Sequence, residues 1–124
     1  MKKIEAIIRK TKFEEVKEAL LDAGIEWFSY SEVRGIGKSR QARIYRGVLY
    51  GTDIIERIML TIVVRNVNVE KTVNAILLSA QTGEIGDGRI FVSTVDESYR
   101  IRTGERGDIS LYNQDEEESV EEKK

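Results

Sequence analysis

Three glycines within six residues mark the stretch of this sequence that is best suited to hold an anion. They are Gly83, Gly86 and Gly88. Glycine lets the backbone turn its N–H groups toward one point, which makes a nest for a negative charge. Arg89 adds a fixed positive charge directly after the last glycine. The pattern therefore predicts a loop that holds phosphate.

The same stretch has the glycine spacing of a Walker phosphate loop but lacks its chemistry. Arg89 and Ile90 stand where that motif needs Lys followed by Ser or Thr. A helical pattern precedes the loop and a strand pattern follows it, which reverses the usual order. These differences exclude a P-loop NTPase and leave a plain glycine-rich turn as the alternative.

The composition argues against catalysis. The chain of 124 residues contains no His and no Cys. The commonest general base, the commonest metal ligand and any thiol nucleophile are therefore missing. A carboxylate-based phosphohydrolase using Asp87 stays open, but no base dyad or metal cluster accompanies it, and Asp87 is more simply a turn residue that orders its own loop.

Two charged segments stand out, one inside the expected globular part and one after it. Hydrophobic residues make up 40% of the chain and charged residues 34%, which is typical of one soluble domain. No apolar run approaches a membrane span and no signal peptide is visible, so we expect a cytoplasmic protein. The tail over residues 113–124 has six acids against two lysines and is expected to be disordered. Residues 34–54 carry five basic residues against Asp53 alone and predict a long loop for an anion or a partner.

The periodicity predicts two β-α-β units. Alternating apolar residues indicate strands over 3–9, 25–34, 57–64 and 89–95. A capping box at Thr11 and an N-cap at Asn68 indicate the starts of two helices, the first of which ends at Gly24. The order β-α-β-loop-β-α-β is that of an α+β, ferredoxin-like split βαβ sandwich. The strands also carry apolar residues on their second face, which suggests burial in an oligomer.

A second pair of basic residues follows the last strand. Arg100 and Arg102 lie two positions apart in a segment expected to be extended. Because side chains alternate along a strand, we expect both guanidinium groups on the same face.

Five stretches of the chain resemble the PII signal-transduction family. They are residues 1–8, 35–37, 45–50, 82–92 and 100–105. The last two, Thr82-Gly83-Glu84-Ile85-Gly86-Asp87-Gly88-Arg89-Ile90-Phe91-Val92 and Arg100-Ile101-Arg102-Thr103-Gly104-Glu105, are together highly specific to that family. The resemblance covers a domain over residues 1–112. It implies a homotrimer with ATP or ADP in each cleft between subunits, and a mobile T-loop over about residues 37–54.

The resemblance also implies which residues bind the nucleotide. The glycine loop would hold the phosphates from one subunit, while Arg100 and Arg102 would clamp them from its neighbour. Ser29 stands near the adenine in the family, and Lys38 lies at the base of the T-loop. The full implied set is Ser29, Gly35, Gly37, Lys38, Val64, Gly86, Asp87, Gly88, Arg89, Arg100 and Arg102. Mg²⁺ is implied only together with ATP, and no metal is assigned to protein side chains alone.

The T-loop is the implied site of partner binding. Family members act on nitrogen metabolism by binding ammonium channels and enzymes, not nucleic acid. Arg46 matches the arginine that plugs the channel, and Tyr50 matches a tyrosine that is uridylylated. An ammonium channel at the inner face of the membrane is the expected partner, although the protein itself would not insert into the bilayer. A soluble enzyme or another transporter is the alternative.

The implied 2-oxoglutarate site departs from the family pattern. Ser39 stands where the family has the Gln that ligates Mg²⁺, and Gln41 two residues later cannot be assumed to replace it. Arg57 keeps the positive charge of the family's Lys, but the T-loop is one residue shorter than usual. We therefore expect 2-oxoglutarate to bind weakly or not at all. A metal-binding trimer like the copper-tolerance proteins, which share this fold, is a further alternative that the lack of Cys and His argues against.

Overall fold

The protein forms one four-stranded antiparallel sheet with two helices. The structure, a computed structural model, describes residues 1–45 and 48–112, with side chains described for residues 1–37 and 54–112. The strands are β1 (Lys2–Arg9), β2 (Ser29–Tyr45), β3 (Val48–Val64) and β4 (Arg89–Thr94). The helices are α1 (Phe13–Asp22) and α2 (Val69–Ala80). Each follows a short 3₁₀ turn, η1 (Lys10–Lys12) and η2 (Asn66–Asn68), and a further one, η3 (Asp108–Leu111), follows β4. The strand order β2-β3-β1-β4 confirms the predicted ferredoxin-like sandwich.

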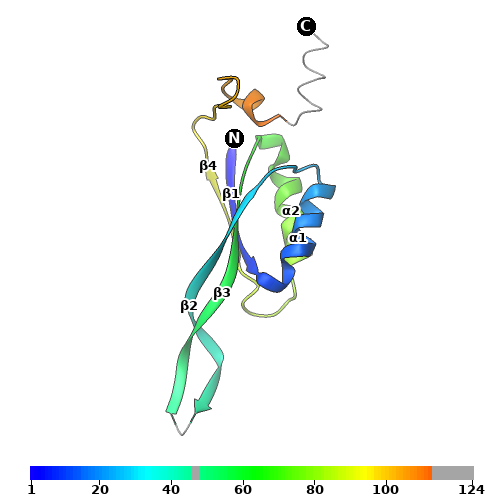
Figure 1. The fold of residues 1–124 in the computed structure, drawn as a ribbon. Coiled ribbons are helices and arrows are strands. Elements are labelled where there is room, and N and C mark those ends of the chain that lie inside the picture. Colours follow the sequence, from blue (N-terminus) through cyan, green and yellow to red (C-terminus); the bar gives the residue numbers. More distant parts are fainter. Residues whose placement is uncertain (46–47, 113–124) are drawn as a thin grey trace.

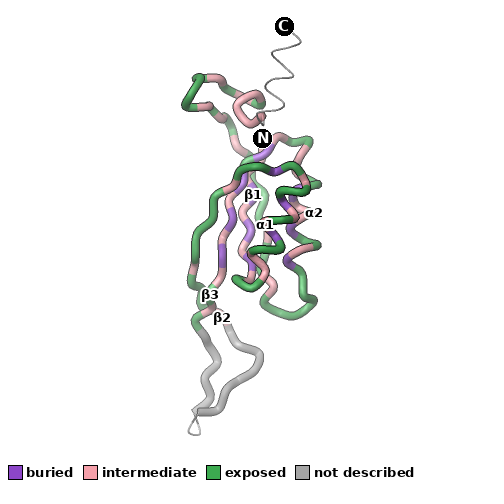
Figure 2. The backbone as a smooth tube through the Cα atoms, turned by 45° about the vertical axis from the view of Figure 1, so that its right-hand side comes forward, coloured by how far each residue is buried: buried purple, intermediate pink, exposed green. Residues whose placement is uncertain are grey.

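The core lies between the helices and one face of the sheet. Both helices cover the same face, and the buried positions of β1 and β3 alternate along each strand (Figures 1 and 2). The buried apolar residues are Ile4, Ala6, Ile8, Val16, Leu20, Ile25, Ile58, Leu60, Ile62, Val64, Ile76 and Ala80. This set contains the alternating residues of β1 and β3 and, from the two helices, Val16, Leu20, Ile76 and Ala80.

No element of the described chain covers the other face of the sheet. This open face carries Ile7 paired with Met59, and Lys3 paired with Val63. Phe91 on β4 lies opposite Glu5 on the same face and is 50% exposed. The face thus mixes apolar and charged side chains, as the sequence suggests for a surface that another copy of the chain could cover.

The backbone of the segment predicted as a long loop between the second and third strands is a paired ribbon of β2 and β3. β2 and β3 stay paired beyond the last β1 pair, Arg9 with Arg57, and continue outward to Tyr45 opposite Val48. Their register shifts between Lys38 and Arg43. This outer ribbon has no third strand and no helix to pack on, so its sequence needs no alternating apolar face and gives no strand signal. Its mobility stays a prediction.

The start of the first helix differs from the sequence prediction, while the second begins at the predicted residue. η1 precedes α1, so the N-cap is Lys12 rather than Thr11, and no side chain caps the helix. Asn68 is the N-cap of α2 but makes no side-chain cap bond; its carbonyl instead accepts the Thr72 hydroxyl at 2.6 Å. Gly24 follows α1 with a φ of +83°, which confirms it as the left-handed residue that ends the helix. No helix in the described ranges is both long and apolar enough to cross a membrane.

Candidate functional site

The glycine loop connects α2 to β4 and is built on left-handed glycines. Gly83, Gly86 and Gly88 have φ values of +86°, +101° and +103°. Side chains are strained in this region of backbone conformation, which accounts for the three glycines. A Cβ on Gly88 would lie 1.7 Å from the Ile7 carbonyl oxygen. The loop is therefore pressed against the backbone of the central strand β1.

Asp87 organises the inside of the loop. Its carboxylate accepts hydrogen bonds from the backbone N–H groups of Thr82 at 2.8 Å and Gly83 at 2.9 Å. The Thr82 hydroxyl donates to the same carboxylate. That hydroxyl and then the Thr82 backbone N–H hold the pKa of Asp87 well below its ordinary value. These contacts support the prediction that Asp87 orders its own loop.

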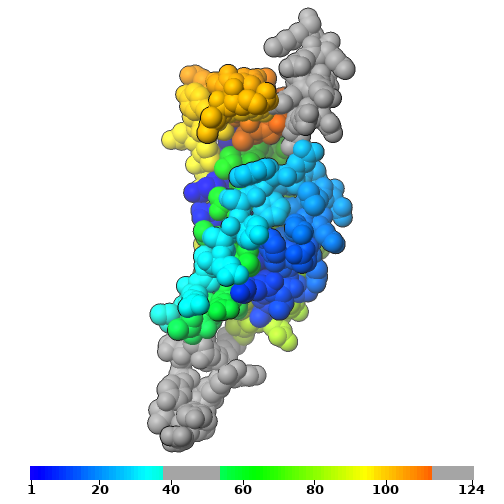
Figure 3. All heavy atoms as spheres, in the orientation of Figure 1, coloured from blue at the N-terminus to red at the C-terminus, as the bar shows by residue number. Residues whose placement is uncertain are grey.

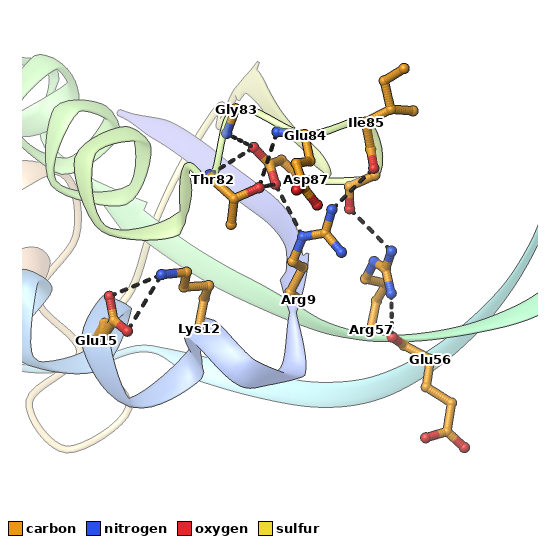
Figure 4. Close-up of polar contacts among 11 residues, drawn as sticks. Arg9, Lys12, Glu15, Glu56, Arg57, Thr82, Gly83, Glu84, Ile85 and Asp87 are labelled. Atoms are coloured by element: carbon orange, nitrogen blue, oxygen red, sulfur yellow. Dashed lines mark hydrogen bonds and ion pairs between the residues drawn. The ribbon is translucent and has the colours of Figure 1, made fainter. Parts of the chain in front are cut away.

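Two arginines tie the loop to the sheet, as Figure 4 shows. Arg9, at the end of β1, donates from Nε to Asp87 Oδ1 at 3.0 Å and from Nη2 to the Ile85 carbonyl at 3.0 Å. Arg57 on β3 donates from Nη2 to the Gly86 carbonyl at 3.1 Å. Burial and then the positive charge of Arg9 lower the pKa of the Arg57 guanidinium. The loop therefore lies beside two like charges held close together.

The loop retains backbone donors for a ligand. Within the described part of the chain, no hydrogen bond is recorded from the N–H groups of Gly86, Asp87 and Gly88. Arg89 follows at the start of β4 and is exposed. Three adjacent N–H groups beside exposed Arg89 are the chemistry that a phosphate group needs.

A second candidate region lies at the other end of the sheet. A cavity of about 400 Å³ is lined by Ser29, Val64 and Arg100, among others. Arg100 donates to the carbonyls of Ile109 at 3.0 Å, Ser110 at 3.3 Å and Tyr112 at 3.1 Å. It also pairs with Glu105 at 3.3 Å. Arg100 thus holds the C-terminal turn against the cavity.

The extended segment predicted around the arginine pair is wrong. Residues 101–103 form a turn, closed by a hydrogen bond from Gly104 N to the Arg100 carbonyl at 2.7 Å. Gly104 has a φ of +73°, which permits this turn. Arg100 is partly buried while Arg102 is exposed, so strand alternation does not relate them.

The two candidate regions cannot meet within one chain. Arg89 pairs with Ile7, whereas Val64 pairs with Lys2, five residues away along β1. At ~3.3 Å per residue, this separation is about 17 Å. In Figure 3 the orange atoms of the C-terminal segment and the yellow-green atoms that follow α2 lie toward opposite ends of the molecule. Of the predicted residues, Gly86, Asp87, Gly88, Arg89 and Arg57 gather at one end and Ser29, Val64 and Arg100 at the other.

Comparison with known proteins identifies the family. A model of the family described as "Nitrogen regulatory protein P-II" matches residues 1–105. The chain belongs to this family.

Proteins named "Nitrogen regulatory protein P-II" are similar to it over most of their length. The protein from Bradyrhizobium diazoefficiens is 47% identical over 108 residues, which cover 86% of this chain and 96% of that protein. The protein from Microchaete diplosiphon is 49% identical over 107 residues, covering 86% and 96%. The protein from Cereibacter sphaeroides is 45% identical over 112 residues, covering 90% and 100%. Membership of the P-II family supports signal transduction in nitrogen regulation, a regulatory rather than an enzymatic role.

Several predicted residues fall where the structure gives no side chains. Lys38, Ser39, Gln41 and Tyr50 lie within β2 and β3, but their side chains are outside the described residues. Arg46 and the tail over 113–124 lie outside the described residues altogether. Gly35 and Gly37 are on β2, paired with Ile55 and Asp53 beyond the Arg57 position, at the glycine-loop end of the sheet.

Sequence reasoning missed Arg9 and Thr82. Arg9 contacts Asp87 from a position 78 residues away, so spacing alone cannot find it. Its place at the end of β1, next to the strand that follows the loop, is the signal that could have done so. Across the described residues, no group of three or more carboxylates, His or Cys is close enough to hold a metal ion.

Proposed function

We propose that this P-II family member binds ATP or ADP at a site shared between two copies of the chain. The glycine loop of one copy holds the phosphates, and Arg100 and Arg102 of the next copy approach them from the other side. The observation that supports this most is the separation of about 17 Å along β1, since one chain cannot bring both groups to one ligand.

The residues present fit a nucleotide. The N–H groups of Gly86, Asp87 and Gly88 and the charge of Arg89 suit phosphate oxygens. The cavity with Ser29 and Val64 has a volume of about 400 Å³, within the range of small-ligand sites. Isothermal titration calorimetry with ATP and ADP tests this part. Micromolar binding of both nucleotides is expected, and no binding of either would refute the proposal.

The assembly proposed is a homotrimer. The open sheet face, with Ile7, Met59, Val63 and Phe91, supports contact between copies because it leaves apolar area uncovered. Size-exclusion chromatography with light scattering should give three chains per particle. A monomer at micromolar concentration would contradict the shared site.

The proposed output is control of an ammonium channel by the T-loop over about residues 37–54. A channel would be captured from a membrane extract with ADP or with ATP, but not equally with both. Arg46→Glu should abolish capture, and a nucleotidyl group on Tyr50 should do the same by bulk and charge. Capture of a soluble enzyme instead would favour the alternative partner. Channel binding that persists in Arg46→Glu would refute the proposal that Arg46 blocks the channel.

The proposed 2-oxoglutarate site is weakened. Ser39 is too short to ligate the Mg²⁺ of bound ATP, so the site loses one ligand, on the order of 1–3 kcal/mol or ten- to a hundredfold in affinity. Calorimetry with Mg-ATP present should show weak or no binding. Ser39→Gln should tighten it if the side chain is what is missing, and tight binding to the wild type would show the idea wrong.

A further inference from the structure

The cavity at the far end of the sheet has an aromatic wall that the proposed phosphate chemistry does not use. Trp27 lines it together with Ser29, Val64, Arg65, Lys71 and Arg100. Trp27 lies in the non-regular segment between α1 and β2, two positions before Ser29. An indole, a hydroxyl and three cationic side chains therefore border one hollow of about 400 Å³.

Trp27 is one of several large apolar side chains left in solvent, and it is the one whose flat ring borders this cavity among the exposed residues that line it. It is 78% exposed, whereas nearby Ile25 is 6% exposed and belongs to the core. Trp27 is not among the residues of the hydrophobic core, so core packing does not account for a tryptophan at this position. An exposed indole at the mouth of a cavity is a surface on which a flat ring can stack.

The cationic side of the cavity is already positioned. The Arg65 guanidinium carbon lies 4.4 Å from the centre of the Tyr112 ring, and Arg100 holds the Tyr112 carbonyl. The Ser29 hydroxyl lies 3.5 Å from the Thr61 carbonyl on the same rim. The cavity therefore borders a stacking ring, a hydroxyl and cationic groups, which suit a ligand that has a flat ring and negative charge.

We propose that Trp27 stacks on the purine base of the bound nucleotide and determines preference for a nucleotide over a bare polyphosphate. This inference rests on the proposed nucleotide site. Aromatic stacking on a base tolerates any base, because every base has a π face. The indole then contributes affinity for the base, while Arg89, Arg100 and Arg102 contribute affinity for the phosphates.

The chain offers a direct test because Trp27 is its only tryptophan. ATP, ADP and inorganic tripolyphosphate would each be titrated into the intact protein, with calorimetry and tryptophan fluorescence recorded in parallel. ATP and ADP should change the fluorescence at saturation. Tripolyphosphate should bind to the free protein without changing its fluorescence, and should reverse the change caused by ATP when it displaces ATP.

Substitution separates the base contact from the phosphate contacts. Trp27→Ala should weaken ATP binding roughly ten- to a hundredfold and leave tripolyphosphate binding unchanged. Trp27→Phe should recover most of the loss, since it keeps a stacking ring. Leu78→Ala is the matched control, because Leu78 is 82% exposed on α2 and lies outside the cavity; it should change neither affinity.

Three results would overturn the inference. If ATP binds by calorimetry but leaves the tryptophan fluorescence of the wild type unchanged, and Trp27→Ala binds ATP as tightly as the wild type, stacking is wrong although the nucleotide site stands. The same holds if tripolyphosphate changes the fluorescence as much as ATP does. If the wild type binds neither ATP nor ADP, the proposed function fails and the stacking proposal with it.

Discussion

The two ends of the sheet both use arginine to hold backbone carbonyl groups, but they draw on different parts of the chain. At the glycine-loop end, Arg9 reaches Asp87 across 78 residues of sequence. At the cavity end, Arg100 reaches Ile109, Ser110 and Tyr112, which lie 9–12 residues away. The first end is therefore part of the global fold, while the second is a local turn attached to it. Substitutions at the first end should therefore lower the stability of the whole domain, whereas substitutions at the second end should disturb only the C-terminal turn.

Gly88→Ala should break the first end most severely. The added Cβ would meet the Ile7 carbonyl oxygen at 1.7 Å, on a backbone whose φ is +103°. Backbone strain and overpacking together should cost about 2–5 kcal/mol of unfolding free energy. Urea denaturation followed by circular dichroism measures it.

Gly104→Ala at the second end is the matched control. Its φ is +73°, but nothing lies within 4 Å of the added Cβ. Only the strain remains, about 1–2 kcal/mol. Equal losses for the two variants would mean that the contact with β1 contributes nothing.

Arg102→Ala should lose most ATP affinity while the fold and the assembly survive. A charge-assisted contact to phosphate is worth ~1.5–3 kcal/mol, or roughly ten- to more than a hundredfold in affinity. Arg89→Ala should act similarly from the opposite end of the sheet. Arg106→Ala, at an exposed arginine near Glu97, is the control and should bind normally. Unchanged calorimetric affinity in Arg102→Ala would refute its assignment.

Arg9→Met and Arg100→Met sharpen the comparison between the ends. Removing Arg9 leaves the Asp87 carboxylate and the Ile85 carbonyl without that donor, at a cost of about 1–3 kcal/mol. We expect faster hydrogen exchange at Thr82 and Gly83 in Arg9→Met, and in Arg100→Met at Ser110 and Tyr112 instead. Exchange that accelerates at both ends in either variant would show that the two regions are coupled.

Asp87 should give the smallest effect that depends on pH, and this dependence is confined to acid. Its pKa is lowered in the folded protein, so the stabilisation is fully present above its unfolded pKa of about 3.9 and is lost as the pH falls through the folded value. Below about pH 4, the wild type should lose stability more steeply than Asp87→Asn. Thr82→Val should flatten the slope partly, because the Thr82 hydroxyl is the largest cause of the shift. Parallel slopes in all three proteins would contradict the role of this hydrogen bond.

The fold was predictable where one face of an element is buried. Ile4, Ala6 and Ile8 alternate because a helix layer covers that side of β1, and this pattern is visible in the sequence. The outer part of the β2–β3 ribbon has no such layer, so its sequence shows no alternation of apolar residues that would predict the strand pairing. The capping box at Thr11 failed because η1 intervenes before α1, whereas Asn68 and Gly24 stand at the predicted helix ends.

The candidate site was predictable only in its local part. The glycine loop and Asp87 lie within a few residues and carry their own turn signal. Arg9 does not, since its partner depends on which strands become neighbours. The turn around Arg102 was missed because Gly104 adopts a positive φ that alternation cannot anticipate.

The glycine loop and the arginine pair, each half of the proposed ligand site, lie near opposite ends of β1, and this has a consequence for symmetry. Each chain in the proposed assembly would border two ligands, with its loop at one and its arginines at another. A row of copies with free ends would leave one loop and one arginine pair without a partner. Only a closed ring uses every half-site, because the contact is heterologous and the rotation returns to the first chain. The number of ligands then equals the number of chains, and a single damaged chain would impair two neighbouring sites.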